Sequence, residues 1–154
     1  MRFIRKNIYL LFLLTCLISS AQEKVIIFSI NDIHSRIENF SKIKPLIDNE
    51  RGKGNKVFFV SAGDIFSGNP IVDNYSEKGF PIIDLLNRTG LDISVIGNHE
   101  FDYGQNVLND RISQANFPFV CANFSGGEGE LSNVKGVEII QKDGFSIAYI
   151  GAIE

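Results

Sequence analysis

The sequence predicts an α/β fold built on a parallel sheet, and two observations carry this prediction. Short apolar runs alternate with longer amphipathic segments in the order strand, helix, strand, helix, strand, which is the pattern of crossover units. Polar clusters follow three of the apolar runs, and the sites of such sheets lie beyond the carboxyl ends of the strands. The length of 154 residues suits one domain, and 44% hydrophobic with 21% charged residues is a globular composition.

The first predicted strand and the first predicted helix are adjacent in the chain. Residues 24–30 form a short apolar run that is typical of a buried strand. The segment after it predicts a helix that ends near Glu50, with Phe40, Ile43, Leu46 and Ile47 on one apolar face. Because a proline is tolerated only in the first turn of a helix, Pro45 allows a start as late as Lys44.

The remaining elements follow from the same patterns. Strands are predicted where apolar residues form short runs, helices where they recur at helical spacing, and a hairpin where a short polar turn joins two runs. The further predicted strands are residues 56–61, 91–96 and 117–122, the predicted helices are 79–87 and 104–114, and the predicted hairpin joins 137–141 to 145–150. A glycine-rich stretch at residues 126–129 predicts a flexible loop.

The N-terminus has the organisation of a secretory signal peptide. A basic start at residues 2–6 precedes an apolar run at residues 8–18, which is shorter than the roughly 20 residues of a membrane-spanning helix. Small residues follow, so we expect residues 1–21 to be removed by cleavage after Ala21. The chain is then exported to the periplasm, the cell surface or the medium. A lipoprotein anchored at Cys16 is the alternative, although the residue before this cysteine fits a lipidation box poorly.

Charge and cysteine content exclude several classes of protein. The net charge of −3 argues against nucleic-acid binding, which needs a basic surface. Removing residues 1–21 removes three basic and no acidic residues, so the charge becomes −6. Cys121 is then the only cysteine, which excludes an intramolecular disulfide. The chain has two histidines, so a His-rich metal site would be short of ligands.

The first polar cluster follows the strand at residues 24–30. Asp32 and His34 are two positions apart, so both side chains can point to one side and offer a carboxylate oxygen and an imidazole nitrogen to one cation. Such a pair also recurs by chance. The alternative is a helix or turn cap made by Asp32 beside an exposed His34, and for this motif alone that alternative is favoured.

Two further clusters follow the next two strands. Gly63 permits close approach of the backbone to a ligand, and Asp64 has two oxygens that can bridge two cations, with an Asx-turn as the equally favoured alternative. In the third cluster, Asn98 offers a neutral oxygen and His99 can act on a substrate if Asp102 orients its ring. The alternative for this third cluster is a polar loop that caps the following helix, and the residue pattern favours the functional interpretation over it. Both histidines of the chain lie in these clusters.

Together the three motifs resemble the calcineurin-like metallophosphoesterases. The residues that carry the resemblance are NDIH at 31–34, GD at 63–64 and GNHE at 97–100. The stretches 86–104 and 66–70 are similar to the secreted 5′-nucleotidase branch, beside UDP-sugar hydrolases and 2′,3′-cyclic-nucleotide phosphodiesterases. The resemblance implies the N-terminal part of a four-layer αββα sandwich over residues 22–154.

The resemblance also implies a two-metal site that hydrolyses phosphate esters, with nucleotides as the expected substrates. Asp32 and His34 would bind the first metal, Asp64 would bridge both, and Asn98 would bind the second. His99 would be the catalytic histidine and Asp102 its orienting partner, whereas Glu100 belongs to the motif without being a usual ligand.

This ligand set agrees with general chemistry. Two cations about 3.5–4 Å apart activate a bridging water as hydroxide and neutralise the phosphoryl oxygens. The protonated catalytic histidine stabilises the charge that develops on the phosphoryl group. Mixed oxygen and nitrogen ligands suit Zn²⁺, Mn²⁺ or Fe, and the sequence does not choose among them.

The family pattern extends beyond the motifs found here. Family members carry further histidine ligands, including a G-H-x-H-like motif, in a second half, and 5′-nucleotidases carry a C-terminal nucleotide domain. We therefore expect a fragment of a longer enzyme, with sheet residues 25–30 and 57–60 left uncovered on one face. The alternatives are a truncated, catalytically incompetent metal-binding fragment and a chain whose site is completed by a partner chain.

Overall fold

The computed structural model describes residues 24–124, 131 and 133–153. Its centre is a parallel sheet in which the spatial order of the strands equals their order in the chain. These strands are β1 Val25–Ile30, β2 Lys56–Ser61, β3 Ile93–Val95, β4 Phe119–Val120 and β5 Val134–Lys135. The predicted signal peptide and the predicted loop at residues 126–129 lie outside the described residues.

Helices connect β1 to β2, β2 to β3 and β3 to β4, because parallel neighbours need a crossover and this is usually a helix. They are α2 Phe40–Gly52, α3 Pro70–Asp73, α4 Phe80–Thr89 and α5 Gln105–Gln114, with 3₁₀ turns η1 Ile37–Asn39 and η2 Asn98–Phe101. An antiparallel hairpin follows, made of β6 Val137–Lys142 and β7 Phe145–Ile150. The α/β class and the parallel sheet predicted from the sequence are confirmed.

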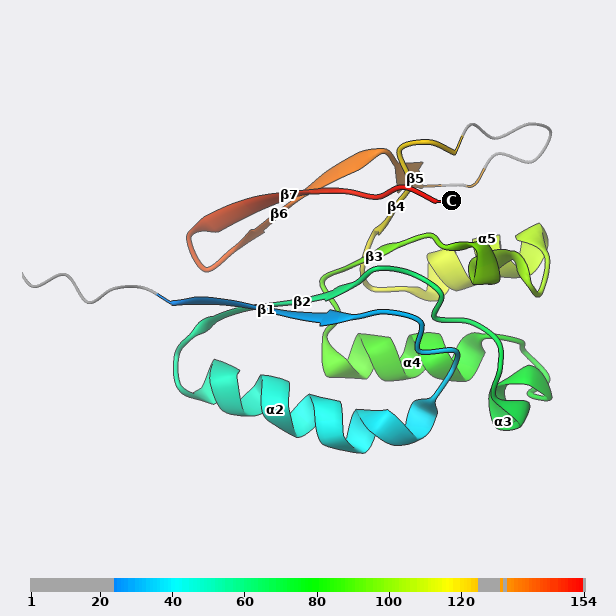
Figure 1. Cartoon of the computed structure of the whole chain (residues 1–154), viewed down its shortest axis with the longest axis horizontal. Helices are drawn as coiled ribbons and strands as arrows, with labels where there is room; N and C mark the ends of the chain where they lie inside the picture. The colour runs from blue at the N-terminus through cyan, green and yellow to red at the C-terminus, as the bar shows by residue number, and fades with distance from the viewer. Residues whose placement is uncertain (1–23, 125–130, 132, 154) are drawn as a thin grey trace, which may run out of the picture.

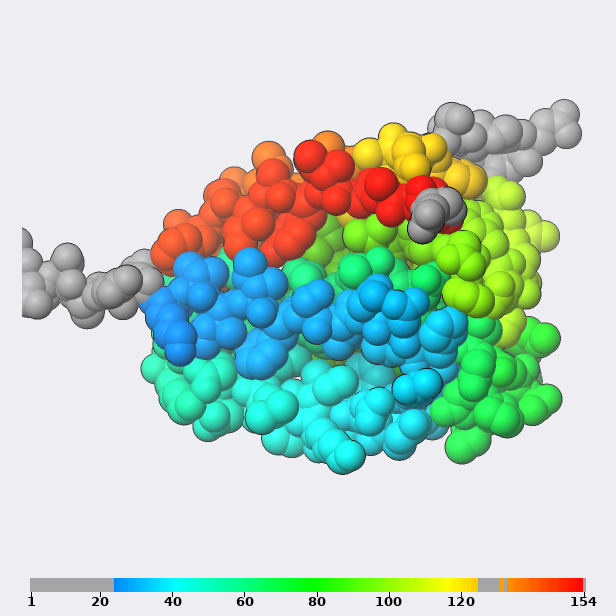
Figure 2. Space-filling model, in the orientation of Figure 1, coloured from blue at the N-terminus to red at the C-terminus, as the bar shows by residue number. Residues whose placement is uncertain are grey.

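The elements form layers. Helices α2 and α4 cover one face of the sheet, and the hairpin lies over the opposite face (Figure 1). In the space-filling view α2, in cyan, lies below the blue first strand and the red hairpin lies above it (Figure 2). This helix–sheet–hairpin order is three layers of the expected four-layer sandwich.

The core lies between the sheet and the helices. Its fully buried side chains come from β2, α2 and α4 and include Phe59, Ile47, Ile82, Ile83 and Leu86. Burying an aliphatic or aromatic side chain contributes roughly 1.5–3 kcal/mol, so this cluster is the main source of stability. It also holds the strand ends at fixed positions beneath the polar loops.

Helix α2 begins at Phe40, the first residue of the predicted apolar face, and not as late as Lys44. Pro45 therefore lies inside the helix and not in its first turn. Phe40 is buried in the core, and this burial stabilises a first turn that the missing proline hydrogen bond weakens. Leu46 was expected on the inward face but is 60% exposed.

The expectation of an uncovered sheet face holds for β1 only. β1 is the edge strand, and its Ile27 is 53% exposed. In β2, Phe58 on the hairpin side of the sheet is fully buried, contrary to that expectation. The hairpin provides part of the cover, because the ammonium group of Lys142 lies 5.8 Å from the Phe58 ring centroid.

One carboxylate ties the hairpin to the sheet. Asp92, just before β3, accepts the backbone N–H of Phe59 at 2.8 Å. The ammonium group of Lys142 in β6 donates to both oxygens of Asp92, at 2.9 and 3.1 Å. The contact joins the two β layers at the end of the sheet that is opposite the polar loops.

Candidate active site

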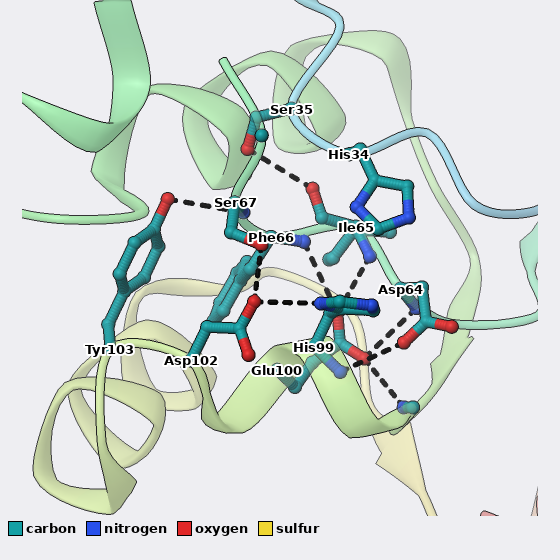
Figure 3. A network of polar contacts seen from close by, with 12 residues as sticks. His34, Ser35, Asp64, Ile65, Phe66, Ser67, His99, Glu100, Asp102 and Tyr103 are labelled. Atoms are coloured by element: carbon teal, nitrogen blue, oxygen red, sulfur yellow. Dashed lines mark hydrogen bonds and ion pairs between the residues drawn. The ribbon is translucent and has the colours of Figure 1, made fainter. Parts of the chain in front are cut away.

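The three polar loops meet at the carboxyl ends of β1, β2 and β3. The backbone N–H groups of Asp32 and His34 donate to the carbonyls of Gly63 and Asp64, at 3.3 and 3.2 Å. The His34 and His99 rings meet edge to face, with centroids 4.5 Å apart and an interplanar angle of 74°. Both histidines predicted from the sequence therefore belong to one site (Figure 3).

The backbone of the site is unusual for residues with side chains. Asp32, His34, Asp64 and Ser67 have φ values of 48°, 44°, 52° and 56°, in the left-handed region. That region costs a residue other than glycine roughly 1–2 kcal/mol. Such conformations gather at functional sites, where the surrounding structure imposes them.

Two glycines allow the second and third loops to pack back to back. Gly63 has a φ of 103°, and a Cβ there would lie 3.0 Å from the backbone N of Gly97. A Cβ on Gly97 would overlap the Asp64 carboxylate and lie 2.9 Å from the Asp64 backbone N. The absent side chain of Gly97 therefore makes room for Asp64, whose Oδ1 accepts the N–H of His99 at 3.0 Å.

His99 and Asp102 form the pair that the sequence predicts. The imidazole Nδ1 lies 2.8 Å from Oδ2 of Asp102. The hydrogen bond to Asp102 raises the pKa of His99 above its ordinary value, although partial burial opposes the shift. Burial raises the pKa of Asp102, but the hydrogen bonds from Ser67 and His99 outweigh it and leave that pKa below its usual value. Both effects favour a charged imidazole beside a carboxylate.

Glu100 is the central residue that sequence reasoning left out of the site. It is fully buried, and its two oxygens accept four backbone N–H groups. The donors are Asp64 at 3.0 Å, Ile65 at 2.7 Å, Phe66 at 3.4 Å and Gly97 at 2.6 Å. Burial raises the pKa of Glu100 and these hydrogen bonds oppose the shift. One side chain thereby joins the loop after β2 to the loop after β3.

The predicted metal ligands lie at the same edge of the sheet. Asp32 Oδ1 is 4.0 Å from the His34 Nε2, and Asp32 Oδ2 accepts the Asn31 amide at 2.5 Å. Asn98 is the first residue of η2, directly before His99. The oxygen and nitrogen donors match the chemistry of Zn²⁺, Mn²⁺ or Fe.

The arrangement of these donors does not by itself form a metal cluster. Within the part of the chain that the structure describes, no three His, Cys, Asp or Glu side chains are placed so that they could hold one ion. One oxygen of Asp64, Oδ1, accepts the backbone N–H of His99. The ligand set Asp32, His34, Asp64 and Asn98 therefore remains a prediction.

A second group of residues was also missed by sequence reasoning. The backbone N–H of Ser67 donates to the Tyr103 hydroxyl at 3.1 Å, and that hydroxyl donates to Asp73 of α3. The N–H of Gly68 donates to Asp73 at 3.2 Å. No motif marks Tyr103, because its contacts with Ser67 and Asp73 join residues 36 and 30 positions apart in the chain.

Comparisons with known proteins support the resemblance in the motifs. The family model described as calcineurin-like phosphoesterase matches residues 26–151. A 2′,3′-cyclic-nucleotide 2′-phosphodiesterase/3′-nucleotidase of Haemophilus influenzae is 39% identical over 90 residues, which cover 54% of this chain and 14% of the relative. A 5′-nucleotidase of Vibrio vulnificus is 31% identical over 139 residues, covering 83% of this chain and 25% of the relative.

A solved structure shows the same fold. The 5′-nucleotidase precursor of Thermus thermophilus has a TM-score of 0.76 at 22% identity, over 82% of this chain and 28% of the other. The chain thus spans between 14% and 28% of the length of these three proteins. Its relatives are nucleotidases and phosphodiesterases, which are hydrolases, and the family match extends over almost all of the described residues. The chain belongs to the calcineurin-like phosphoesterase family.

Proposed function

We propose that this chain carries the first-half ligands and the catalytic histidine of a metal-dependent phosphoesterase that acts on nucleotides. The observation that supports the proposal most is the convergence of three strand-end loops on one point, where the His34 ring contacts the His99 ring and Asp64 accepts the His99 N–H. The names of the Haemophilus and Vibrio relatives support a nucleotide as the substrate.

Each residue has a stated role in this proposal. Asp32, His34, Asp64 and Asn98 would hold two divalent cations, which activate water and neutralise phosphoryl oxygens. The imidazolium of His99 donates a hydrogen bond to a phosphoryl oxygen as negative charge develops there. A positive charge on this ring is favoured because its pKa is raised by the hydrogen bond to Asp102.

Asp102 and Glu100 would act through other residues. Asp102 orients the His99 ring through Nδ1 and so leaves Nε2 free to face the substrate. Glu100 anchors the loop that carries Asp64, and so keeps that carboxylate at the edge of the site.

Hydrolysis by the purified chain tests the proposal. The chain is loaded with Mn²⁺ or Zn²⁺ and incubated with AMP, 3′-AMP, 2′,3′-cyclic AMP or p-nitrophenyl phosphate. We expect hydrolysis, measured as phosphate released from the three monoesters and as nucleoside monophosphate formed from 2′,3′-cyclic AMP. Asp64→Ala should abolish it, and Asp143→Ala, in the exposed hairpin turn, should leave it unchanged. Comparing the rates with the four substrates assigns the substrate class.

The alternative is a metal-binding chain that is incompetent alone or needs a partner chain to complete its site. The two oxygen donors expected at the second metal favour this alternative, because neither is an imidazole. Metal analysis with one equivalent or less, together with no turnover of any substrate, would contradict the proposal for this chain and support the alternative.

We also propose that the chain is exported. None of the helices in the described ranges is long and apolar enough to cross a membrane. A C-terminally tagged chain produced in a bacterium is expected outside the cytoplasm, with a mass that corresponds to cleavage after Ala21. The variant Cys16→Ser tests the lipoprotein alternative, since it would abolish membrane anchoring of a lipoprotein and leave a cleaved soluble chain unchanged. Full-length protein confined to the cytoplasm would contradict export.

A further inference from the structure

One oxygen of Asp102 accepts two hydrogen bonds from two different loops. The hydroxyl of Ser67, in the loop after β2, donates to Oδ2 of Asp102 at 2.5 Å. The Nδ1 of His99 lies 2.8 Å from the same oxygen. Figure 3 shows Asp102 between these two side chains.

The pair of His99 and Asp102 needs such support because it is open to solvent. Their side chains are 37% and 38% exposed, and an exposed ion pair contributes at most about 1 kcal/mol. Water competes for both partners, and the carboxylate can turn about its last torsion. A second donor on the same oxygen restricts that rotation and so selects one orientation of the carboxylate.

Ser67 is itself held by the surrounding structure. Its φ of 56° is a conformation that a serine adopts only when its neighbours impose it. Its N–H donates to Tyr103, whose ring stacks on the buried Phe66 at a centroid distance of 5.8 Å. The next N–H, from Gly68, donates to Asp73. These contacts aim the Ser67 hydroxyl at Asp102.

We propose that Ser67 is a positioning residue for the catalytic histidine. Its hydroxyl holds the Asp102 carboxylate in the orientation that accepts the Nδ1–H of His99, so that Nε2 faces the substrate and donates from the imidazolium. The same orientation keeps the remaining proton on Nδ1 when the ring is neutral. Tyr103 supports this arrangement by fixing the backbone of Ser67. The inference rests on the proposed catalytic role of His99, which it deepens.

The tautomer of His99 is the readout. Two-dimensional ¹H–¹⁵N NMR of imidazole nitrogens distinguishes the Nδ1–H from the Nε2–H form, at a pH where the ring is neutral and without metal or substrate. The chain has two histidines, so the variant His34→Gln assigns the signals. We expect the wild type to show the Nδ1–H form at His99. Because no turnover is needed, a chain that hydrolyses nothing still gives a result, which separates this test from that of the proposed function.

Two variants of Ser67 separate the effect of the hydroxyl from the effect of the strained backbone. Ser67→Ala removes the hydroxyl, and Ser67→Gly removes it while also relieving the left-handed strain. Both should shift His99 severalfold toward the Nε2–H form. Ser113→Ala is the matched control, since it also deletes a hydroxyl that donates a hydrogen bond, to the Asn109 carbonyl in α5. This control should keep the wild-type spectrum.

Three outcomes would overturn the proposal. The first is a wild-type His99 in the Nε2–H form. The other two are a Ser67→Ala spectrum and a Ser67→Gly spectrum identical to that of the wild type, since either would mean that the hydroxyl is not needed. Circular dichroism shows whether each variant is folded. If Ser67→Ala does not fold, Ser67→Gly still decides the question, because glycine adopts the backbone conformation of this loop without strain.

Discussion

Gly97→Ala should destabilise the protein although alanine suits its backbone. The φ and ψ of Gly97 are −98° and −176°, which is extended backbone that any residue adopts. The new Cβ would overlap the Asp64 carboxylate and lie 2.8 Å from its Cγ and 2.9 Å from its backbone N. Turning the Asp64 side chain away relieves only the contacts with the carboxylate, so the backbone of the loop must move as well.

The expected loss in the free energy of unfolding can be worked out from these contacts. Ordinary van der Waals contact begins at 3.4 Å, so the Asp64 N must retreat by 0.5 Å, the difference between that limit and its present distance. Overpacking of this kind costs about 1–3 kcal/mol. The displaced carboxylate also loses its hydrogen bond from the His99 N–H, and such bonds to charged groups contribute about 1.5–3 kcal/mol. We expect a loss of about 2–4 kcal/mol, because the two effects overlap in part.

Urea unfolding followed by circular dichroism measures this loss. Gly52→Ala is the matched control, since nothing lies within 4 Å of its Cβ position at the end of α2. The control should be neutral or stabilising by up to about 1 kcal/mol. Calorimetric titration with Mn²⁺ should show weaker binding to Gly97→Ala than to the control. A Gly97→Ala protein as stable as the control would refute the packing argument.

Three further experiments test the pairing of His99 with Asp102, the burial of Cys121 and the contact between Asp92 and Lys142. Asp102→Asn replaces the charged acceptor that raises the pKa of His99 with a neutral amide, so an NMR titration should show that pKa falling toward its ordinary value; an unchanged curve would contradict the pairing. Since the folded pKa of His99 is raised, protonation of this ring stabilises the fold at low pH, and the contribution is lost as pH rises through the folded pKa. Cys121 is 4% exposed, so in the Cys16→Ser chain its thiol should react with a thiol reagent only in denaturant, and rapid labelling of that native protein would count against its burial. Asp92→Ala removes the acceptor of Lys142 and of a buried N–H, and should lower the free energy of unfolding by about 1–3 kcal/mol in urea. An unchanged urea midpoint for this variant would mean that the contact does not stabilise the fold.

The position of the site was predictable from the sequence because it follows from topology. Parallel strands joined by crossovers end at the same edge of a sheet, so residues after consecutive strands must converge. Asp32, Asp64 and Asn98 each follow such a strand, and local polarity is enough to recognise them. The pairing of His99 with Asp102 was equally accessible, because the two residues lie within one turn of each other.

Other features depend on contacts that local sequence does not show. Glu100 has the same local pattern as an exposed acidic residue, and its four donors exist only after two loops have met. β5 has two residues and α3 has four, which is too short for any periodic pattern. The sequence left the start of α2 open between Phe40 and Lys44, because the burial of Phe40, which outweighs the effect of Pro45, is a property of the whole fold.

The site residues with left-handed backbone conformations reduce the stability of the fold while supplying the side chains of the proposed activity. Glycine would adopt the backbone conformations of Asp32, His34 and Asp64 without penalty, but it would remove the side chains that the proposed chemistry needs. A variant library selected only for thermal tolerance should therefore enrich glycine at these three positions. A library selected for phosphate release should retain the wild-type residues and collect its stabilising changes elsewhere.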